Sequence, residues 1–257
     1  MAAALALAAP LPLAAAFSAI VGPPRFELRA NPGAVVREAL DIGSDAIEAA
    51  EFSVRSADWD LGADGNVVFR EGDPGEASCR PWVRLERRDV RLAPRARRKF
   101  RFEVHVPPDA RAGECRFALL IEGKEPSLAE GTIRLPMQGR IAVIVYVAVG
   151  DARARLEYRS LQVATVNGKV YPSITFANTG NAHGRPEGTL EARDANGKSL
   201  EFSVSPSPVL PGTTRSLPIW PNDGADGKTP AFAYPLRLKG TVEWDGGKHA
   251  VDTVVRP

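Results

Sequence analysis

The stretch TIRLPMQGRIAVIVYVAV, residues 132–149, decides how the first half of this chain folds. Apolar Ile133, Leu135 and Met137 alternate with polar residues or proline, so the start of the stretch has one apolar face. From Ile141 to Val149 both alternating sets are apolar, which is typical of a strand buried on both faces. The stretch therefore predicts a long strand that either connects two domains or offers an edge to a partner.

Short alternating runs separated by turn residues recur along the whole chain, which contains 22 prolines and 23 glycines. In the clearest run, Phe100, Phe102 and Val104 share one face. Seven such runs precede residue 150 and seven follow it, and Asn167-Gly168 is a strong hairpin signal. This pattern predicts an all-β protein of two tandem immunoglobulin-like β-sandwich domains, at residues 24–150 and 151–257.

The beginning of the sequence has a different composition. Residues 1–16 are almost entirely Ala, Leu and Pro and end in three alanines, as in the apolar region and cleavage site of a secretory signal. We therefore expect residues 1–18 to be a signal peptide and the protein to be periplasmic; a poorly ordered or mis-assigned N-terminus is the alternative. With two prolines, the segment is also shorter than the ~20 apolar residues of a membrane helix, so we do not expect a transmembrane protein.

The chain contains two cysteines, Cys79 and Cys115. In an exported protein such a pair predicts one disulfide. It would close a loop of roughly 36 residues and stabilise the fold by ~3–4 kcal/mol. In a cytosolic protein the same two residues would be free buried thiols, so this prediction depends on export.

The sequence shows no pattern typical of catalysis or metal binding. Its three histidines lie far apart, and His105 falls on the outward face of an alternating strand, where we expect it to be solvated. Nucleophile-elbow, phosphate-loop and dinucleotide motifs are absent from the sequence. Counted from Asp60, an acidic stretch fits part of a calcium loop, but Gly62 occupies a ligand position and an Asp-Gly hairpin explains the stretch better. We expect no enzymatic activity, cofactor or metal.

The basic segment, defined as Arg80–Arg101, contains ten basic residues against Glu86 and Asp89. One interpretation is a site for an anionic partner such as nucleic acid, an anionic glycan or lipid headgroups. The other is a solvated edge hairpin whose charges discourage aggregation. Export and the lack of interleaved aromatic residues argue against nucleic acid.

Four segments of the first half form a recognisable set: PRFELRANPG at 24–33, Val106-Pro107-Pro108, CRFALLIE at 115–122, and TIRLPMQGRIAVIVYV at 132–147. In these segments the chain resembles the periplasmic pilus-assembly chaperones, whose fold is two immunoglobulin-like sandwiches. The second half resembles that family only in outline.

The resemblance implies that Ile133, Leu135 and Met137 form an edge lent to an incomplete pilin-type subunit, as in donor-strand complementation. It also implies two basic anchors for the subunit's terminal carboxylate. Arg29 matches on the first strand, with Arg25 as second choice, and Arg140 matches on the last.

Two hypotheses about function follow. The leading one is a non-enzymatic periplasmic chaperone-like protein that binds exported β-rich, pilin-type subunits by strand donation. The alternative is a cell-envelope binding or scaffold module, in which residues 133–149 are a buried interdomain strand and the basic segment contacts an anionic polymer or a surface protein. Neither involves nucleic acid.

Overall fold

The computed structural model describes residues 18–62, 65–124, 127–128, 136–137, 139–224 and 227–257, with backbone alone at 127–128 and 136–137. Almost all of the predicted signal peptide therefore lies outside the described residues. The chain divides into two compact units: unit 1 contains residues up to Asp109 together with Cys115–Val147, and unit 2 contains Ala110–Glu114 and Ala148–Pro257. The domain boundary at residue 150 stays a prediction.

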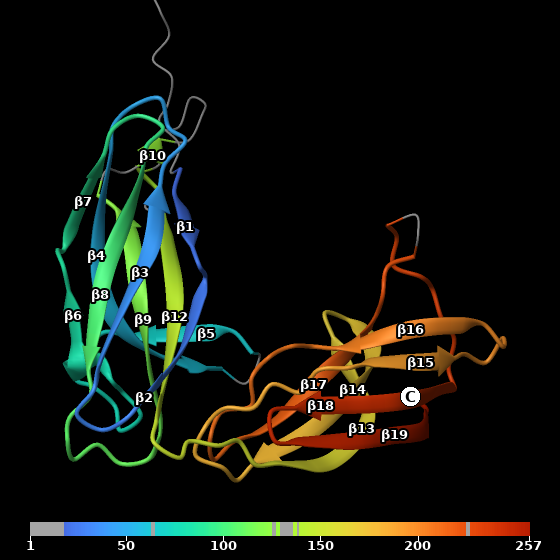
Figure 1. Ribbon diagram of the computed structural model, residues 1–257. Coiled ribbons are helices and arrows are strands. Elements are labelled where there is room, and N and C mark those ends of the chain that lie inside the picture. The colour runs from blue at the N-terminus through green and yellow to red at the C-terminus, as the bar shows by residue number, and fades with distance from the viewer. Residues whose placement is uncertain (1–17, 63–64, 125–126, 129–135, 138, 225–226) are drawn as a thin grey trace, which may run out of the picture. The chain divides into compact units, whose positions relative to one another are not determined.

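The described elements are strands apart from one short turn of 3-10 helix, which confirms the predicted all-β class (Figure 1). In chain order they are β1 (Ile20–Gly22), β2 (Arg25–Ala30), β3 (Val35–Gly43), β4 (Ala50–Leu61), β5 (Val67–Arg70), η1 (Arg80–Trp82), β6 (Val83–Leu85), β7 (Asp89–Leu92), β8 (Arg97–His105), β9 (Gly113–Gly123), β10 (Ser127–Leu128), β11 (Pro136–Met137), β12 (Arg140–Val149), β13 (Leu156–Val166), β14 (Lys169–Asn178), β15 (Thr189–Arg193), β16 (Ser199–Val204), β17 (Thr214–Pro221), β18 (Leu236–Trp244) and β19 (Gly247–Val255).

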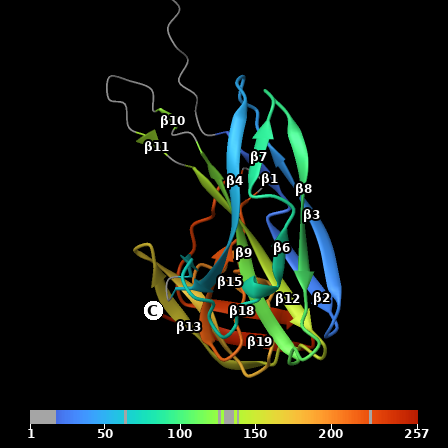
Figure 2. The ribbon, with the colours of Figure 1, turned by 90° about the vertical axis from the view of Figure 1, so that its left-hand side faces the viewer.

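Unit 1 is a sandwich of two sheets (Figures 1 and 2). One sheet has the strand order β1-β3-β8-β6, and the other has the order β2-β12-β9-β4-β5, with β7 also paired to β4. Strict alternation explains β8, because Phe100, Phe102 and Val104 are buried while Arg101 between them is exposed. Apolar residues of both sheets fill the space between them and exclude water from it.

The second half of β12 is covered on both faces, as its sequence predicts. Val143, Val145 and Val147 are fully buried in the core of unit 1. On the opposite face, Tyr146 is buried against Trp59 of β4, with the two rings edge to face and their centroids 5.3 Å apart. Such aromatic pairs favour this geometry because the positive ring edge meets the negative ring face.

Unit 2 contains one path of seven strands, β13-β14-β17-β16-β15-β18-β19. The path curls around a core of buried residues that includes Phe176, Phe202 and Leu190. Its two ends meet, because Tyr158 of β13 stacks on His249 of β19 with ring centroids 3.9 Å apart. The predicted Asn167-Gly168 hairpin joins β13 and β14, and both residues have positive φ, 50° and 76°.

Candidate functional site

The candidate site lies at the start of β12, where one side of the strand has no partner strand among the described residues. Ile144 donates its N–H to the carbonyl of Pro24, 3.1 Å away, immediately before β2 begins. The preceding strand β1 belongs to the other sheet, where it pairs with β3. Since β2 and β12 run in the same direction (Figure 1), β2 lies alongside β12 from Ile144 onward and does not lie alongside the residues that precede Ile144. Within the described chain, no strand continues β2 alongside residues 140–143.

The backbone groups at this edge can be assigned from strand geometry. Successive residues of a strand direct their N–H and C=O groups to opposite sides. Because Ile144 faces β2, Ala142 and Arg140 direct their N–H groups to that same side. The carbonyl of Gly139 accepts from Gly123 of β9 at 3.2 Å, which places the odd-numbered residues toward β9. We call the β2 side of residues 140–143 the open edge.

The predicted lending residues precede the open edge in the chain. Ile133 and Leu135 lie outside the described residues. Met137 belongs to β11, whose backbone pairs with β10 at Ser127, so that β10 and β11 extend the hairpin of β9 and β12 (Figure 2). The role of all three residues stays a prediction.

The structure separates the predicted anchors Arg29 and Arg140. Arg29 lies five residues after Pro24, and Arg140 lies four residues before Ile144, in strands of the same direction. At ~3.3 Å per residue the two α-carbons are about 30 Å apart, too far to hold one carboxylate together. Arg25, the second choice, begins β2 beside Ile144 and lies about 15 Å from Arg140 by the same measure. Its side chain pairs with Glu27 at 2.9 Å.

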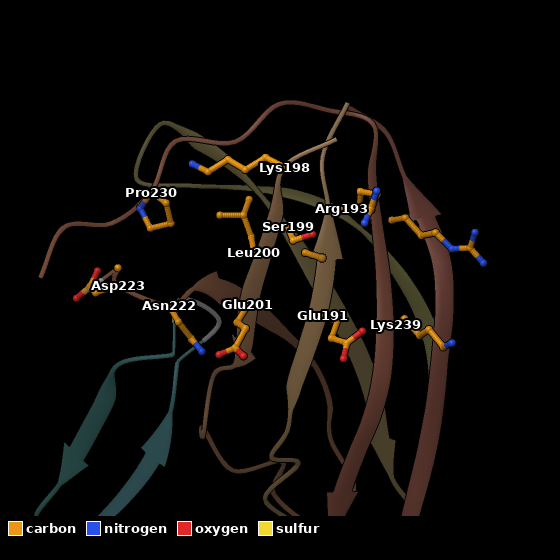
Figure 3. A pocket seen from close by; sticks show the side chains of 13 residues that line it. Glu191, Arg193, Lys198, Ser199, Leu200, Glu201, Asn222, Asp223, Pro230 and Lys239 are labelled. Atoms are coloured by element: carbon orange, nitrogen blue, oxygen red, sulfur yellow. The ribbon is translucent and has the colours of Figure 1, made fainter. Parts of the chain in front are cut away.

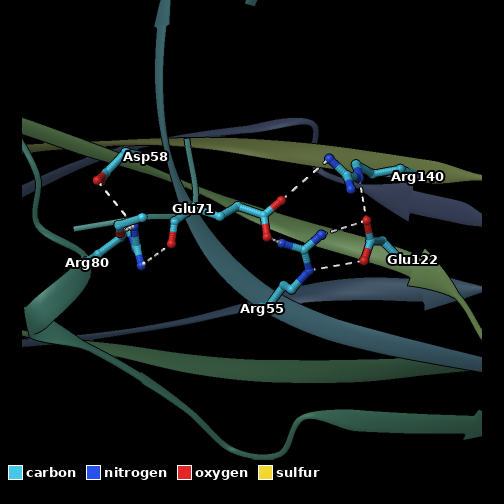
Figure 4. A network of polar contacts seen from close by, with 7 residues as sticks. Arg55, Asp58, Glu71, Arg80, Glu122 and Arg140 are labelled. Carbon is cyan, nitrogen blue, oxygen red and sulfur yellow. Dashed lines mark hydrogen bonds and ion pairs between the residues drawn. The ribbon is translucent and has the colours of Figure 1, made fainter. Parts of the chain in front are cut away.

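Arg140 belongs to a network of four charged side chains on the outer face of the six-stranded sheet (Figure 4). We call Arg55, Glu71, Glu122 and Arg140 the charge network. Arg55 of β4 donates from Nε and Nη2 to the two carboxylate oxygens of Glu122, at 3.0 and 2.8 Å. Arg140 donates from Nε to the same carboxylate. Glu71 pairs with Arg55 and lies 3.7 Å from Nη1 of Arg140.

Glu122 is the buried member of this network, with a side chain only 10% exposed. Burial by itself raises the pKa of the Glu122 carboxyl, but the hydrogen bonds and charges of Arg55 and Arg140 outweigh it and hold the pKa below its ordinary value. The carboxylate is therefore ionised at neutral pH and keeps both guanidinium groups in place.

The segment between β5 and β6 positions Glu71. Arg80 donates to the carbonyls of Gly72 at 2.9 Å and Glu71 at 3.4 Å, and also to the carboxylate of buried Asp58 at 3.3 Å. The disulfide predicted between Cys79 and Cys115 is present and ties this segment to β9, with α-carbons 5.4 Å apart. These contacts hold the backbone of Glu71 beside the sheet.

Sequence reasoning found Arg140 but missed Arg55, Glu71 and Glu122. The sequence does contain a signal for Glu122. This residue directly follows five apolar residues, 117–121, in a strand that must be buried, and a carboxylate at such a position needs a cationic partner. Which arginine supplies the partner depends on the register between β4 and β9, which pairs Arg55 with Leu120.

The basic segment is not one continuous hairpin, which corrects part of the sequence prediction. Its strands β6 and β8 pair antiparallel, with β6 at the edge of their sheet, whereas β7 between them pairs with β4 in the other sheet. The chain crosses between the sheets because Val90 and Phe100 are both buried on the inner faces. Several of its basic residues are paired with acidic residues: Arg80 with Asp58, Arg87 and Arg101 with Glu86, and Arg91 with Glu51.

The acidic stretch that partly fits a calcium loop lies between two paired strands. β4 and β5 pair antiparallel from Asp58 opposite Arg70 to Leu61 opposite Val67. The stretch is therefore a hairpin, as the turn interpretation predicts. Among the residues with described positions, no three His, Cys, Asp or Glu side chains gather as metal ligands. His105 is exposed and contacts Glu103 at 2.7 Å, so the prediction of a solvated histidine is confirmed.

Unit 2 contains a groove of about 860 Å³ over the outer face of β15, β16 and β18 (Figure 3). Glu191 lies directly opposite Glu201 on one side and Lys239 on the other. Arg193 and Lys198 also line the groove. The groove thus presents both charges, and its lining does not indicate one class of ligand.

The described part of the chain contains no helix with the length and apolar character needed to cross a membrane. No protein-family model matches the chain, and no curated protein matches it.

Among solved structures, the fold is similar to that of the class 5 fimbriae chaperone CfaA, with 13% identity, 93% of this chain and 99% of that chain covered, and a TM-score of 0.48. It is also similar to the Salmonella enterica structure of SafA pilin in complex with the SafB chaperone, with a TM-score of 0.49, and to the E. coli chaperone DraB, with a TM-score of 0.47. In both cases the identity is 15%, and 93% of this chain and 97% of that chain are covered. Likeness at this level concerns the arrangement of the strands and carries no statement about function.

Proposed function

We propose that this chain is a non-enzymatic, periplasmic chaperone-like protein that binds exported β-rich, pilin-type subunits by lending them the edge formed by residues 133–137 and the open edge of β12. The observation that carries this proposal is the open edge itself. A strand with unpaired N–H and C=O groups is a template on which another chain can add a strand. The alternating Ile133, Leu135 and Met137 directly precede it and would supply side chains for the grooves of a subunit.

The pairing of β11 supports the same proposal. β10 covers one side of β11, with Leu128 opposite Pro136, so the other side of β11 is the side available to a partner. Pro136 has no N–H, so the ladder lacks one donor at this position. Main-chain hydrogen bonds would supply affinity along residues 140–143, and the apolar side chains would supply specificity.

Arg140 remains the candidate anchor for a subunit carboxylate, and Arg25 is better placed than Arg29 to assist it. Arg140 is the first residue of β12, so a strand paired with the open edge passes beside it. Arginine suits this role because its planar guanidinium can bind both oxygens of a carboxylate.

The direct test is co-expression of the full chain with a pilin-type subunit, followed by size-exclusion chromatography. We expect a one-to-one complex whose yield falls at least tenfold in the double variant Leu135→Glu, Met137→Glu. Val68→Glu is the matched control, because Val68 is exposed on β5 at the opposite end of the same sheet path. Undiminished capture by the double variant, or equal loss in the control, contradicts strand lending.

Hydrogen exchange separates this proposal from a scaffold module with a buried interdomain strand. In the free protein the amide of Ala142 should exchange ~100-fold faster than that of Val143, which faces β9. Subunit binding should slow Ala142 and leave Val143 unchanged. Equally slow exchange of both amides in the free protein would show that the edge is covered and would favour the scaffold.

A further inference from the structure

The charge network contains two carboxylates of very different character. Glu122 lies within β9, is 10% exposed and accepts hydrogen bonds from both arginines. Glu71 follows the last residue of β5 and is 46% exposed. It pairs directly with Nη1 of Arg55, whereas its nearest contact with Arg140 is 3.7 Å, beyond hydrogen-bond length. Removing Glu122 from the network would leave two guanidinium groups without their shared partner. When the Glu71 side chain turns into water it gives up its ion pair with Arg55, and an ion pair between partly exposed side chains contributes little to stability.

The network is electrically neutral as it stands, with two guanidinium groups and two carboxylates. A further carboxylate would make it negative as long as Glu71 stays in place. If the Glu71 side chain leaves, the site carries one positive charge beside a partly buried surface, and a new carboxylate restores neutrality. The site therefore exchanges one carboxylate for another.

We propose that Arg55 and Arg140 form a carboxylate-binding site that the side chain of Glu71 occupies in the unbound protein. An incoming carboxylate displaces Glu71, while Glu122 stays and keeps both arginines oriented. Identifying the incoming group as a carboxylate of the partner strand, terminal or side chain, rests on the proposed function; the anion site itself does not.

The geometry favours this exchange over simple addition. Arg55 is 32% exposed and Arg140 is 43% exposed, so both guanidinium groups can be reached from the outer face of the sheet. Arg140 uses Nε for Glu122, and its Nη1 is directed to Glu71 (Figure 4). The backbone of Glu71 is held by Arg80, so displacement needs rotation of one side chain and no movement of a strand. Glu71 thus acts as a built-in competitor.

The test is an NMR titration of the full chain with its disulfide intact, using sodium acetate as the probe and sodium chloride at equal ionic strength as reference. The Nε–Hε signals of Arg55 and Arg140 are assigned with Arg55→Lys and Arg140→Lys. In Glu71→Gln the acetate concentration at half-saturation of the Arg140 signal should be at least fivefold lower than in the wild type. Glu71→Asp, whose side chain is one methylene shorter and should pair less closely with both arginines, should shift the half-saturation in the same direction.

Glu76→Gln is the matched control. Glu76 is exposed in the same segment, and the substitution removes the same charge outside the charge network. It should leave the acetate response unchanged, and Arg55→Lys should weaken the response in the Glu71→Gln background. Equal half-saturation in wild type and Glu71→Gln, or an equal gain in Glu76→Gln, overturns the proposal.

Two acetylated pentapeptides distinguish the sources of the carboxylate. One has a free terminal carboxylate and no acidic side chain, and the other has a single glutamate and an amidated terminus; a neutral amidated peptide is the reference. The peptide that displaces acetate identifies the class of group that the site accepts. If neither peptide displaces acetate, the result contradicts a carboxylate of a partner strand as the ligand. An acetate response without subunit capture would refute the proposed function alone, and subunit capture without an acetate response would refute this inference alone.

Discussion

The disulfide between Cys79 and Cys115 gives a prediction whose size follows from the structure. It joins residues separated by 36 positions, and closing a loop of that length restricts the unfolded chain by about 4 kcal/mol at 25 °C in the chain-entropy model. Replacing both cysteines by alanine should therefore lower the free energy of unfolding of unit 1 by about 4 kcal/mol. For a unit of this size the corresponding fall in Tm is about 10–15 °C.

Urea unfolding of the full chain at pH 7 measures this change. Segment-resolved hydrogen exchange assigns the transition, because unit 1 should lose protection at lower urea while the core of unit 2 around Phe202 should not. Wild-type protein reduced with dithiothreitol is the control for side-chain loss, and it should agree with the double variant within about 1 kcal/mol. A loss below about 1 kcal/mol in both would refute the chain-entropy reasoning for this loop.

Three further predictions concern single residues. Glu122→Gln should lower the free energy of unfolding by about 2 kcal/mol at pH 7. In urea unfolding, the difference between wild type and variant should narrow below about pH 4.5, because a carboxyl with a lowered folded-state pKa loses its stabilising effect as pH falls through that pKa. A pH-independent difference would contradict this. Gly180→Ala should destabilise unit 2 far more than Gly168→Ala in thermal melts, since its new Cβ would lie 2.3 Å from a backbone oxygen, whereas Gly168 has open space and only the cost of a positive φ, about 1 kcal/mol. Equal effects would show that the backbone adjusts. Burial raises the pKa of Tyr234 to about 12, so ultraviolet titration should show a transition well above pH 10 that is absent in Tyr234→Phe. Because the folded-state pKa is raised, any stability that the Tyr234 hydroxyl adds should be lost only as pH rises above 10.

The sequence predicts those features that depend on a residue's own neighbours in the chain. Alternation in residues 100–104 defines a half-buried strand, and two apolar sets after Ile141 define a strand covered on both faces. The Asn167-Gly168 turn is equally local, since both residues tolerate positive φ. The disulfide was predictable because an exported chain with two cysteines has one possible pairing.

The site could be predicted only in part, because its contacts depend on register and on sheet order. By sequence Arg29 is the better match and Arg25 the second choice, and only the bond from Ile144 to Pro24 shows that Arg25 is nearer to Arg140. The partners of Arg140 come from two distant segments, and nothing local to Glu71 predicts that it faces the start of β12. The basic segment differs from the predicted hairpin for the same reason, since alternation does not reveal that β7 joins the sheet opposite to that of β6 and β8.

The open edge and the charge network belong to one physical problem. An unpaired edge risks unspecific pairing with any exposed strand, and proteins limit that risk with charges, prolines and short edges. Here β2 covers the edge as far as Ile144, Arg140 places a charge at its beginning, and Pro136 removes one donor beyond it. With Glu71 in place, a neutral apolar strand gains only the short ladder along residues 140–143. A strand that also carries a carboxylate gains the two arginines as well, so the network would turn a general liability of edge strands into selectivity for one kind of partner.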